Sequence, residues 1–146
     1  MFMGSRSVVV SVLGSLLALT LDITASAATG VLAVKPPNVN FGTKPVGSFT
    51  VKGATVTNNG SETVSVLVTI EREPDDFSFG LLPGQTCPVF EPAPLAPGES
   101  CVVVMGFRPS EFFAGQGQVA TLSVTASDPA GGVVESVLID FVGRGK

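Results

Sequence analysis

Several side chains on which enzyme chemistry commonly depends are missing from this chain. The 146 residues include no histidine, tryptophan or tyrosine, and the aromatic residues are ten phenylalanines. Without histidine, the chain cannot form a Ser-His-Asp triad, a Cys-His catalytic pair or a histidine-ligated metal site. Ser and Asp are present, but no pattern places them together as a hydrolase would require. We therefore predict a protein that is not an enzyme, with no catalytic residues, no cofactor and no bound metal.

Charge is also scarce, since charged residues make up 14% of the chain. The 8 Lys and Arg residues are scattered and are outnumbered by 12 Asp and Glu, which gives a formal net charge of −4. Nucleic-acid binding usually requires a concentrated basic surface. This balance therefore argues against nucleic acid as a partner.

The N-terminal segment has the organisation of a secretory signal peptide. Arg6 precedes a mostly apolar run over residues 8–21, and Ala25-Ser26-Ala27 forms a small-x-small cleavage site. A retained transmembrane helix is the alternative, but about 14 residues of helix reach roughly 21 Å, short of the ~30 Å hydrocarbon core. We predict a signal peptide at 1–27, a lead-in segment at 28–38 and one domain at 39–146. The product would be secreted, extracellular or periplasmic, with no membrane anchor after cleavage.

Cys87 and Cys101 are the two cysteines of the chain. In an exported protein, such a pair favours one structural disulfide. Closing a loop of about 15 residues would contribute roughly 3 kcal/mol to stability. A redox pair or a soft-metal site fits the spacing poorly, and two buried free thiols remain the alternative.

Apolar residues recur with a period of two along most of residues 39–146, which is typical of β-strands with one buried face. The residues expected on buried faces are Val64, Val66, Val68 and Ile70; Cys101, Val103, Met105 and Phe107; Leu122 and Val124; and Val137, Ile139 and Phe141. The 17 glycines and 11 prolines concentrate between these segments. Short strands with a turn about every ten residues indicate an all-β, Ig-like antiparallel β-sandwich of about seven or eight strands.

Three turns or irregularities follow from the same pattern. The buried parity changes near Gly53, which predicts a β-bulge or kink there. The Asn58-Asn59-Gly60-Ser61 segment predicts a tight hairpin between two strands, because Asn-Gly readily supplies positive φ angles. The segment from Asp128 to Gly132 separates the last two strands.

Several short motifs stand in an order that matches a known Ig-like repeat. They are Val39-Asn40-Phe41-Gly42 with Pro45-Val46-Gly47, Val56-Thr57-Asn58-Asn59-Gly60-Ser61, Asp76-Phe77-Ser78-Phe79, Cys87, Leu95-Ala96-Pro97-Gly98-Glu99-Ser100-Cys101, Phe107-Arg108-Pro109, Ala120-Thr121-Leu122-Ser123-Val124 and Gly143-Arg144-Gly145. Together they resemble the ASH domain of the abnormal-spindle, SPD-2 and hydin proteins, and in particular the secreted bacterial type called choice-of-anchor D. The resemblance covers about residues 39–145. It implies an Ig-like sandwich and carries no catalytic residues with it.

Three further features of the sequence are candidate sites. Glu71, Glu73, Asp75 and Asp76 form an acidic cluster, which we expect to be a solvated turn because it lacks the regular spacing and glycine of a Ca²⁺ loop. A glycosidase carboxylate pair is less favoured still, since no Trp or Tyr is available to stack on a sugar. Asn59-Gly60-Ser61 fits the N-x-S glycosylation pattern, although a turn explains it equally.

Phe112 and Phe113 form a possible interaction loop. Two adjacent phenylalanines in an extended segment cannot both point inward, so one would be exposed. The alternative is that both are tucked under the loop. The sequence thus favours a secreted or cell-surface non-enzymatic Ig-like module that contacts an unknown protein partner. The alternative is a periplasmic chaperone-like assembly factor that pairs through an open sheet edge.

Overall fold

The computed structural model describes residues 30–72 and 78–146, so the predicted signal peptide at 1–27 lies outside the described residues. Nine strands and one 3-10 turn follow in order: β1 (Leu32–Lys35), β2 (Asn38–Lys44), β3 (Thr50–Asn58), β4 (Val64–Arg72), β5 (Phe79–Leu81), β6 (Ala93–Leu95), β7 (Ser100–Phe107), η1 (Glu111–Phe113), β8 (Gly117–Ser127) and β9 (Val133–Gly145). The sequence predicts seven or eight strands, and the very short β5 and β6 account for the higher number.

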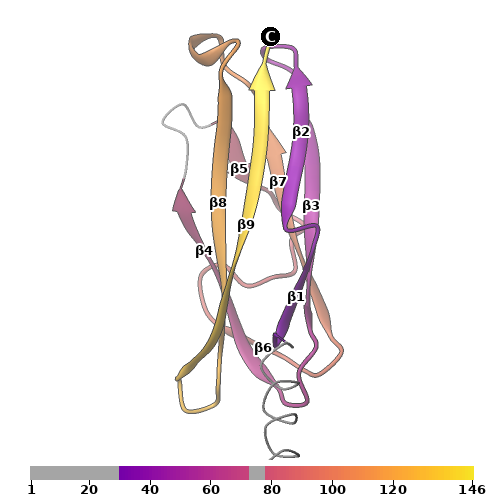
Figure 1. Cartoon of the computed structure of the whole chain (residues 1–146), viewed down its shortest axis with the longest axis vertical. Coiled ribbons are helices and arrows are strands. Elements are labelled where there is room, and N and C mark those ends of the chain that lie inside the picture. The colour runs from indigo at the N-terminus through magenta and orange to yellow at the C-terminus, as the bar shows by residue number, and fades with distance from the viewer. Residues whose placement is uncertain (1–29, 73–77) are drawn as a thin grey trace, which may run out of the picture. The chain divides into compact units, whose positions relative to one another are not determined.

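The strands form two sheets that enclose one hydrophobic core, as Figure 1 shows. One sheet has the order β1-β3-β7-β5, and the other has the order β2-β9-β8-β4-β6. This arrangement confirms the predicted all-β, Ig-like β-sandwich.

One strand pair departs from the antiparallel arrangement that the sequence predicts. β1 pairs antiparallel with β3, whereas β2 pairs parallel with β9 in the opposite sheet. The chain crosses between the sheets at Pro36-Pro37, and the Lys35–Pro36 peptide bond is cis. Two residues separate β1 from β2. Because so short a connection does not reverse the chain, β2 runs beside β9 in the same direction. The segment at 28–38 therefore supplies all of β1 and the first residue of β2.

Phenylalanines from both sheets fill one part of the core. The ring of Phe107 on β7 lies 4.7 Å from that of Phe79 on β5 and 5.3 Å from that of Phe41 on β2. Phe141 on β9 completes the group. A Cβ atom at Gly143 would lie 2.6 Å from the Phe107 ring, so the absence of a side chain there makes room for this packing.

The bulge predicted at Gly53 is wrong. β3 pairs with β7 over eight residues without a register shift. Ala54 and Val56 are buried as expected, but Phe49 and Val51 lie exposed on the outer face. The apolar residues switch from one face of the strand to the other because the outer face also carries apolar residues. The strand itself stays regular.

The tight hairpin predicted at Asn58-Asn59-Gly60-Ser61 is also wrong, because β3 and β4 belong to different sheets. The chain instead turns a corner between the sheets around the buried side chain of Asn58. Its Nδ2 donates to the carbonyl oxygens of Glu62 and Leu95, each at 2.8 Å, and its Oδ1 accepts from Gly60 N at 2.9 Å. Asn58 thereby ties the corner to β6. By contrast, Asp128 to Gly132 does join β8 and β9 in a hairpin, as predicted.

Candidate interaction site

β4 extends beyond the strands that would cover it, and this exposes part of its inner face. Val64, Val66 and Val68 are buried as the sequence predicts, but Ile70 is 51% exposed, so its predicted burial is wrong. β6 pairs with β4 over Val64–Val66, and β5 in the opposite sheet is three residues long. Ile70 therefore faces an opening between the two sheets.

The loop that follows β5 forms the other side of this opening. It turns at Gly84, where φ is +100°, and is held against β7 by the Cys87–Cys101 disulfide that the sequence predicts. The amide groups of Thr86 and Cys87 both donate to the carbonyl of Val102, at 2.9 and 3.1 Å. Val102 N in turn donates to Thr86 Oγ1 at 2.8 Å. Covalent and hydrogen-bonded contacts thus hold the loop on the edge of its sheet.

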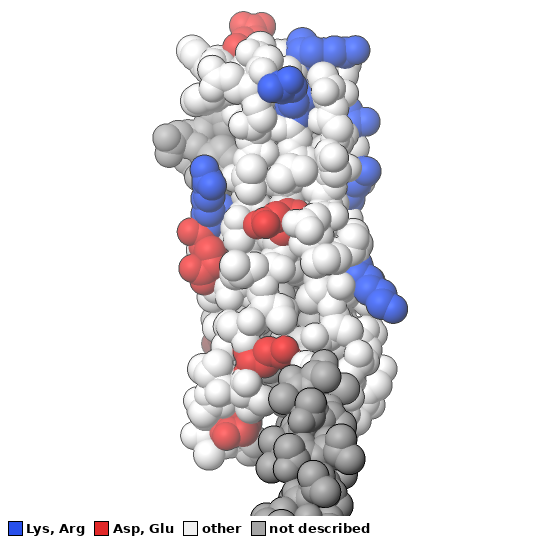
Figure 2. Space-filling view, viewed as in Figure 1, with Lys and Arg blue, Asp and Glu red and all other residues white. Residues whose placement is uncertain are grey.

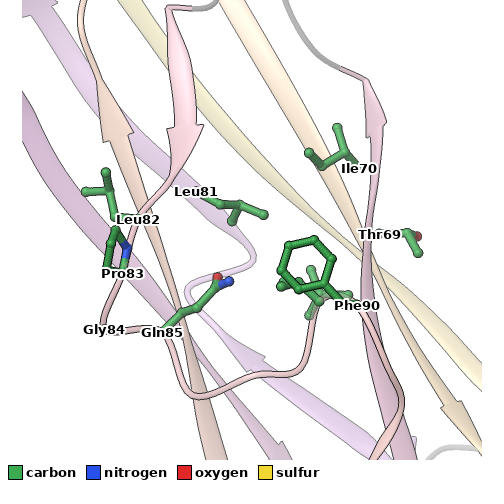
Figure 3. Close-up of a pocket in the computed structure, with 10 residues that line it drawn as sticks. Thr69, Ile70, Leu81, Leu82, Pro83, Gly84, Gln85 and Phe90 are labelled. Atoms are coloured by element: carbon green, nitrogen blue, oxygen red, sulfur yellow. The ribbon is translucent and has the colours of Figure 1, made fainter.

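Between β4 and this loop lies an apolar groove of about 640 Å³. Its walls include Val68, Ile70, Leu81, Leu82, Val89 and Phe90. Figure 3 shows the ring of Phe90 and the side chains of Leu81 and Gln85 around the same space. Phe90 is 94% exposed, and none of the described residues that line the groove is charged. A concave, uncharged surface of this kind suits apolar side chains of a ligand.

Two polar groups border the apolar walls. The Oε1 atom of Gln85 is buried and makes no hydrogen bond with any described residue. Arg72 lines a second small cavity of about 20 Å³ together with Ile70 and Leu81, which places Arg72 at one end of the groove. The groove therefore offers one buried acceptor and one positive charge beside its apolar walls.

The opposite seam between the sheets has a different character. There Lys52 on β3 donates from Nζ to the carbonyl oxygen of Asn40 on β2, at 2.7 Å. Further along β2, Lys44 lies beside Lys146, since Lys146 N donates to Lys44 O at 2.9 Å. Figure 2 shows most of the visible Lys and Arg along the β2 side and the upper end of this face, with a further basic group beside acidic residues on the opposite side, while Asp and Glu are scattered. Lysines on an edge strand commonly protect it from pairing.

Phe112 and Phe113 lie in η1 on the loop between β7 and β8. Phe112 is 89% exposed, whereas Phe113 is partly buried. The loop contacts the end of β9, where Gly115 N donates to Gly145 O at 2.8 Å. Its role as an interaction loop stays a prediction.

The other candidate residues do not gather into a site in the described part of the chain. Glu71 is exposed and accepts a hydrogen bond from Thr69, while Glu73, Asp75 and Asp76 lie outside the described residues. Among the described residues, no group of three or more potential metal ligands occurs. Asn59 is exposed, and its glycosylation stays a prediction.

Sequence reasoning missed the groove, because its parts are far apart along the chain and share no period. Phe90 stands in a proline-containing stretch with no strand pattern, and the period of two places Ile70 in the core. One usable signal is the combination of a large apolar residue with nearby prolines, since prolines at 88, 92 and 94 leave Phe90 little chance to join a regular ladder.

Solved structures with a similar fold point to one architecture. No known family model matches the sequence, and no curated protein matches it at a significant level. The ASH/PapD-like domain 7 of human CEP192 matches with a TM-score of 0.56 at 11% identity, covering 80% of this chain and 85% of that domain. The chain has the ASH/PapD-like, Ig-type sandwich fold. The narrower choice-of-anchor D label stays a prediction.

The same ASH/PapD-like fold occurs within larger proteins. The VesB protease of Vibrio cholerae matches with a TM-score of 0.61 at 19% identity over 79% of this chain, which spans about a third (32%) of the protease. The YadV chaperone matches with a TM-score of 0.55 at 11% identity over 80% of this chain and 53% of the chaperone. Within residues 30–72 and 78–146, no helix has the length and apolar character needed to cross a bilayer.

Proposed function

We propose that this chain is an exported, non-enzymatic module that binds a protein partner at the cell surface or outside the cell. The observation that carries the proposal is the apolar groove between β4 and the disulfide-held loop, with Ile70 and Phe90 exposed beside it. The disulfide supports an oxidising compartment, and the segment at 1–27 supports export. The absence of histidine from the sequence supports a role without histidine-dependent catalysis.

The first test asks whether the chain is exported and forms its disulfide. The full-length protein is expressed with a C-terminal tag in its source organism, and the exported product is analysed by intact mass and by thiol counting under denaturing conditions. We expect a mature product that begins at Ala28 and contains no free thiol. A cytoplasmic product with two free thiols would overturn the export part of the proposal.

The second test concerns the partner. A photo-crosslinking amino acid is placed at Phe90 in one variant and at Leu138 in a control variant, because Leu138 is 58% exposed on β9 and does not line the groove. We expect one discrete, mass-identifiable protein adduct from position 90 and none from position 138. Equal labelling of many proteins from both positions would contradict a specific interaction.

A chaperone-like assembly factor is the second candidate, favoured by the fold shared with the YadV chaperone and by uncovered strand positions at the groove. The two roles differ in what happens to the partner. If the chain is an assembly factor, its deletion lowers the amount of correctly assembled partner, whereas a structural or adhesive module leaves that amount unchanged. Quantifying the crosslinked partner in a deletion strain separates them.

A further inference from the structure

The corner between β3 and β4 contains a chemically labile pair, Asn59-Gly60. Asn59 is the one asparagine in the sequence that glycine follows. Because glycine has no Cβ atom, its backbone nitrogen can approach the preceding side chain closely. Gly60 N can then bond to Cγ of Asn59, and ammonia leaves with the former amide proton of Gly60. Water opens the resulting succinimide ring at either carbonyl, which leaves aspartate or isoaspartate at position 59.

The structure holds the reacting nitrogen in a hydrogen bond. Gly60 N donates to Oδ1 of Asn58 at 2.9 Å, and Asn59 N donates to Val31 O at 2.7 Å. The proton in the first bond is the one that must leave during ring closure, so the reaction requires that this bond breaks. Asn59 itself is exposed, and solvent therefore reaches it. Protection thus depends on the backbone nitrogen rather than on burial of the asparagine.

The acceptor in that bond is fixed in position. Asn58 is fully buried, and its Nδ2 donates to the carbonyl oxygens of Glu62 and Leu95, each at 2.8 Å. Its backbone is tied to the turn before β7, since Asn58 N donates to Glu99 O at 3.0 Å. Turning the side chain away would leave buried polar groups without partners, which is costly. Oδ1 of Asn58 therefore stays aimed at Gly60 N.

The same corner favours the glycine that makes its neighbour labile. A Cβ atom at Gly60 would lie 3.1 Å from Oδ1 of Asn58 and 3.4 Å from Cγ1 of Val31. The first distance is tighter than most Cβ contacts in proteins, so a side chain here would press on the buried Asn58. The absence of a side chain at Gly60 therefore makes room for the hydrogen bond and also leaves Asn59 open to attack.

We propose that Asn59 is a latent deamidation site, and that the side chain of Asn58 keeps it intact while the corner is closed. The reaction proceeds during openings in which Gly60 N leaves Asn58, so its rate follows the population of the open corner. Isoaspartate carries the main chain through the Cβ atom of residue 59, which lengthens it by one atom and misplaces Gly60 N. The change is irreversible, and it marks chains in which the corner has opened. This inference goes beyond the proposed function and stands independently of it.

The first experiment compares the folded and the denatured chain. The purified chain, with an intact mass that shows no glycan, is incubated at mildly alkaline pH in buffer or in concentrated guanidinium chloride. Peptide mass spectrometry with enzymatic methylation of isoaspartate measures the rate at Asn59, and Asn40 is the internal control because phenylalanine follows it. We expect the rate at Asn59 to be at least tenfold lower in the folded chain. Equal rates in the two states would overturn the protection, and no isoaspartate in the denatured chain would overturn the lability.

Two variants separate the hydrogen bond from general stability. Asn58→Ala removes the acceptor, whereas Asn58→Asp keeps an acceptor and loses the same two Nδ2 donor contacts. Each rate at Asn59 is divided by the rate in the same variant after denaturation. We expect the resulting ratio to be at least fivefold higher for Asn58→Ala than for Asn58→Asp. Equal ratios would show that the Asn58 acceptor has no part in the protection.

A measurement on the unaltered chain applies if either variant fails to fold. Hydrogen exchange of the Gly60 amide reports how often the same hydrogen bond opens. We expect the slowing of exchange at Gly60 to match the slowing of deamidation at Asn59 within about threefold. If Gly60 exchanges as fast as in the denatured chain while Asn59 stays intact, the protection has another cause and the proposal is wrong.

Discussion

The two seams between the sheets are closed by different means. At the β2 seam, polar side chains cross between the sheets and occupy the backbone groups of the edge strand, as Lys52 does with Asn40. At the β4 seam, a loop fixed by the Cys87–Cys101 disulfide stands away from the strand and leaves the apolar groove. The comparison shows polar contacts that occupy backbone groups at one seam, and an apolar groove among the described residues at the other.

The largest effect is expected from removing the covalent support of the groove wall. The double substitution Cys87→Ser with Cys101→Ser should lower the free energy of unfolding by roughly 3 kcal/mol, because the loop of about 15 residues becomes free in the unfolded chain. Urea denaturation followed by circular dichroism measures this. A change below about 1 kcal/mol would show that the hydrogen bonds of Thr86 and Cys87 suffice to hold the loop.

A smaller loss is expected at the corner that leads into β4. Asn58→Ala leaves the carbonyl groups of Glu62 and Leu95 and the amide of Gly60 without their side-chain partner, at a cost of about 2 kcal/mol in total. The matched control is Asn59→Ala, since Asn59 is exposed. Equal stability of the two variants in urea would contradict the role given to Asn58.

At the opposite seam, Lys52→Met removes the donor to Asn40 O and keeps much of the apolar stem. Because Lys52 is exposed, the free energy of unfolding should fall by less than about 1 kcal/mol. The informative readout is self-association, which sedimentation should detect at high protein concentration once the β2 edge is uncovered. Lys44→Met, which removes a nearby charge without freeing Asn40, is the control and should stay monomeric.

The sequence pattern predicts burial correctly where the opposite sheet covers the apolar face of a strand. Strands β7 and β9 show the expected alternation at Val103, Met105, Ile139 and Phe141, because an opposite sheet covers those positions. Ile70 follows the same local pattern, but whether it is covered depends on where β5 and β6 end. The Asn-Gly segment fits a hairpin locally, and the distant contact from Asn58 to Leu95 makes it a corner instead.

The candidate site is less predictable for the same reason. The disulfide follows from two cysteines and a predicted export signal, so one wall of the groove could be anticipated. The groove itself arises because, among the described residues, β6 pairs with β4 over three positions and the covering β5 is equally short. Sequence periodicity reports which residues could be buried, and it does not report which of them lack a covering partner.

The smallest effect on stability is expected from replacing two exposed phenylalanines. The same two variants distinguish the groove from the β7–β8 loop as the interaction site. Phe90 is 94% exposed at the groove and Phe112 is 89% exposed on η1, so replacing either by Ser should change the free energy of unfolding by less than about 0.5 kcal/mol. Partner binding should separate them. If the groove is the interaction site, Phe90→Ser weakens the partner interaction at least fivefold in a titration and Phe112→Ser leaves it unchanged. The reverse result would place the interaction on the β7–β8 loop, as the adjacent phenylalanines in the sequence predict, and would make the open seam a by-product of a short β5.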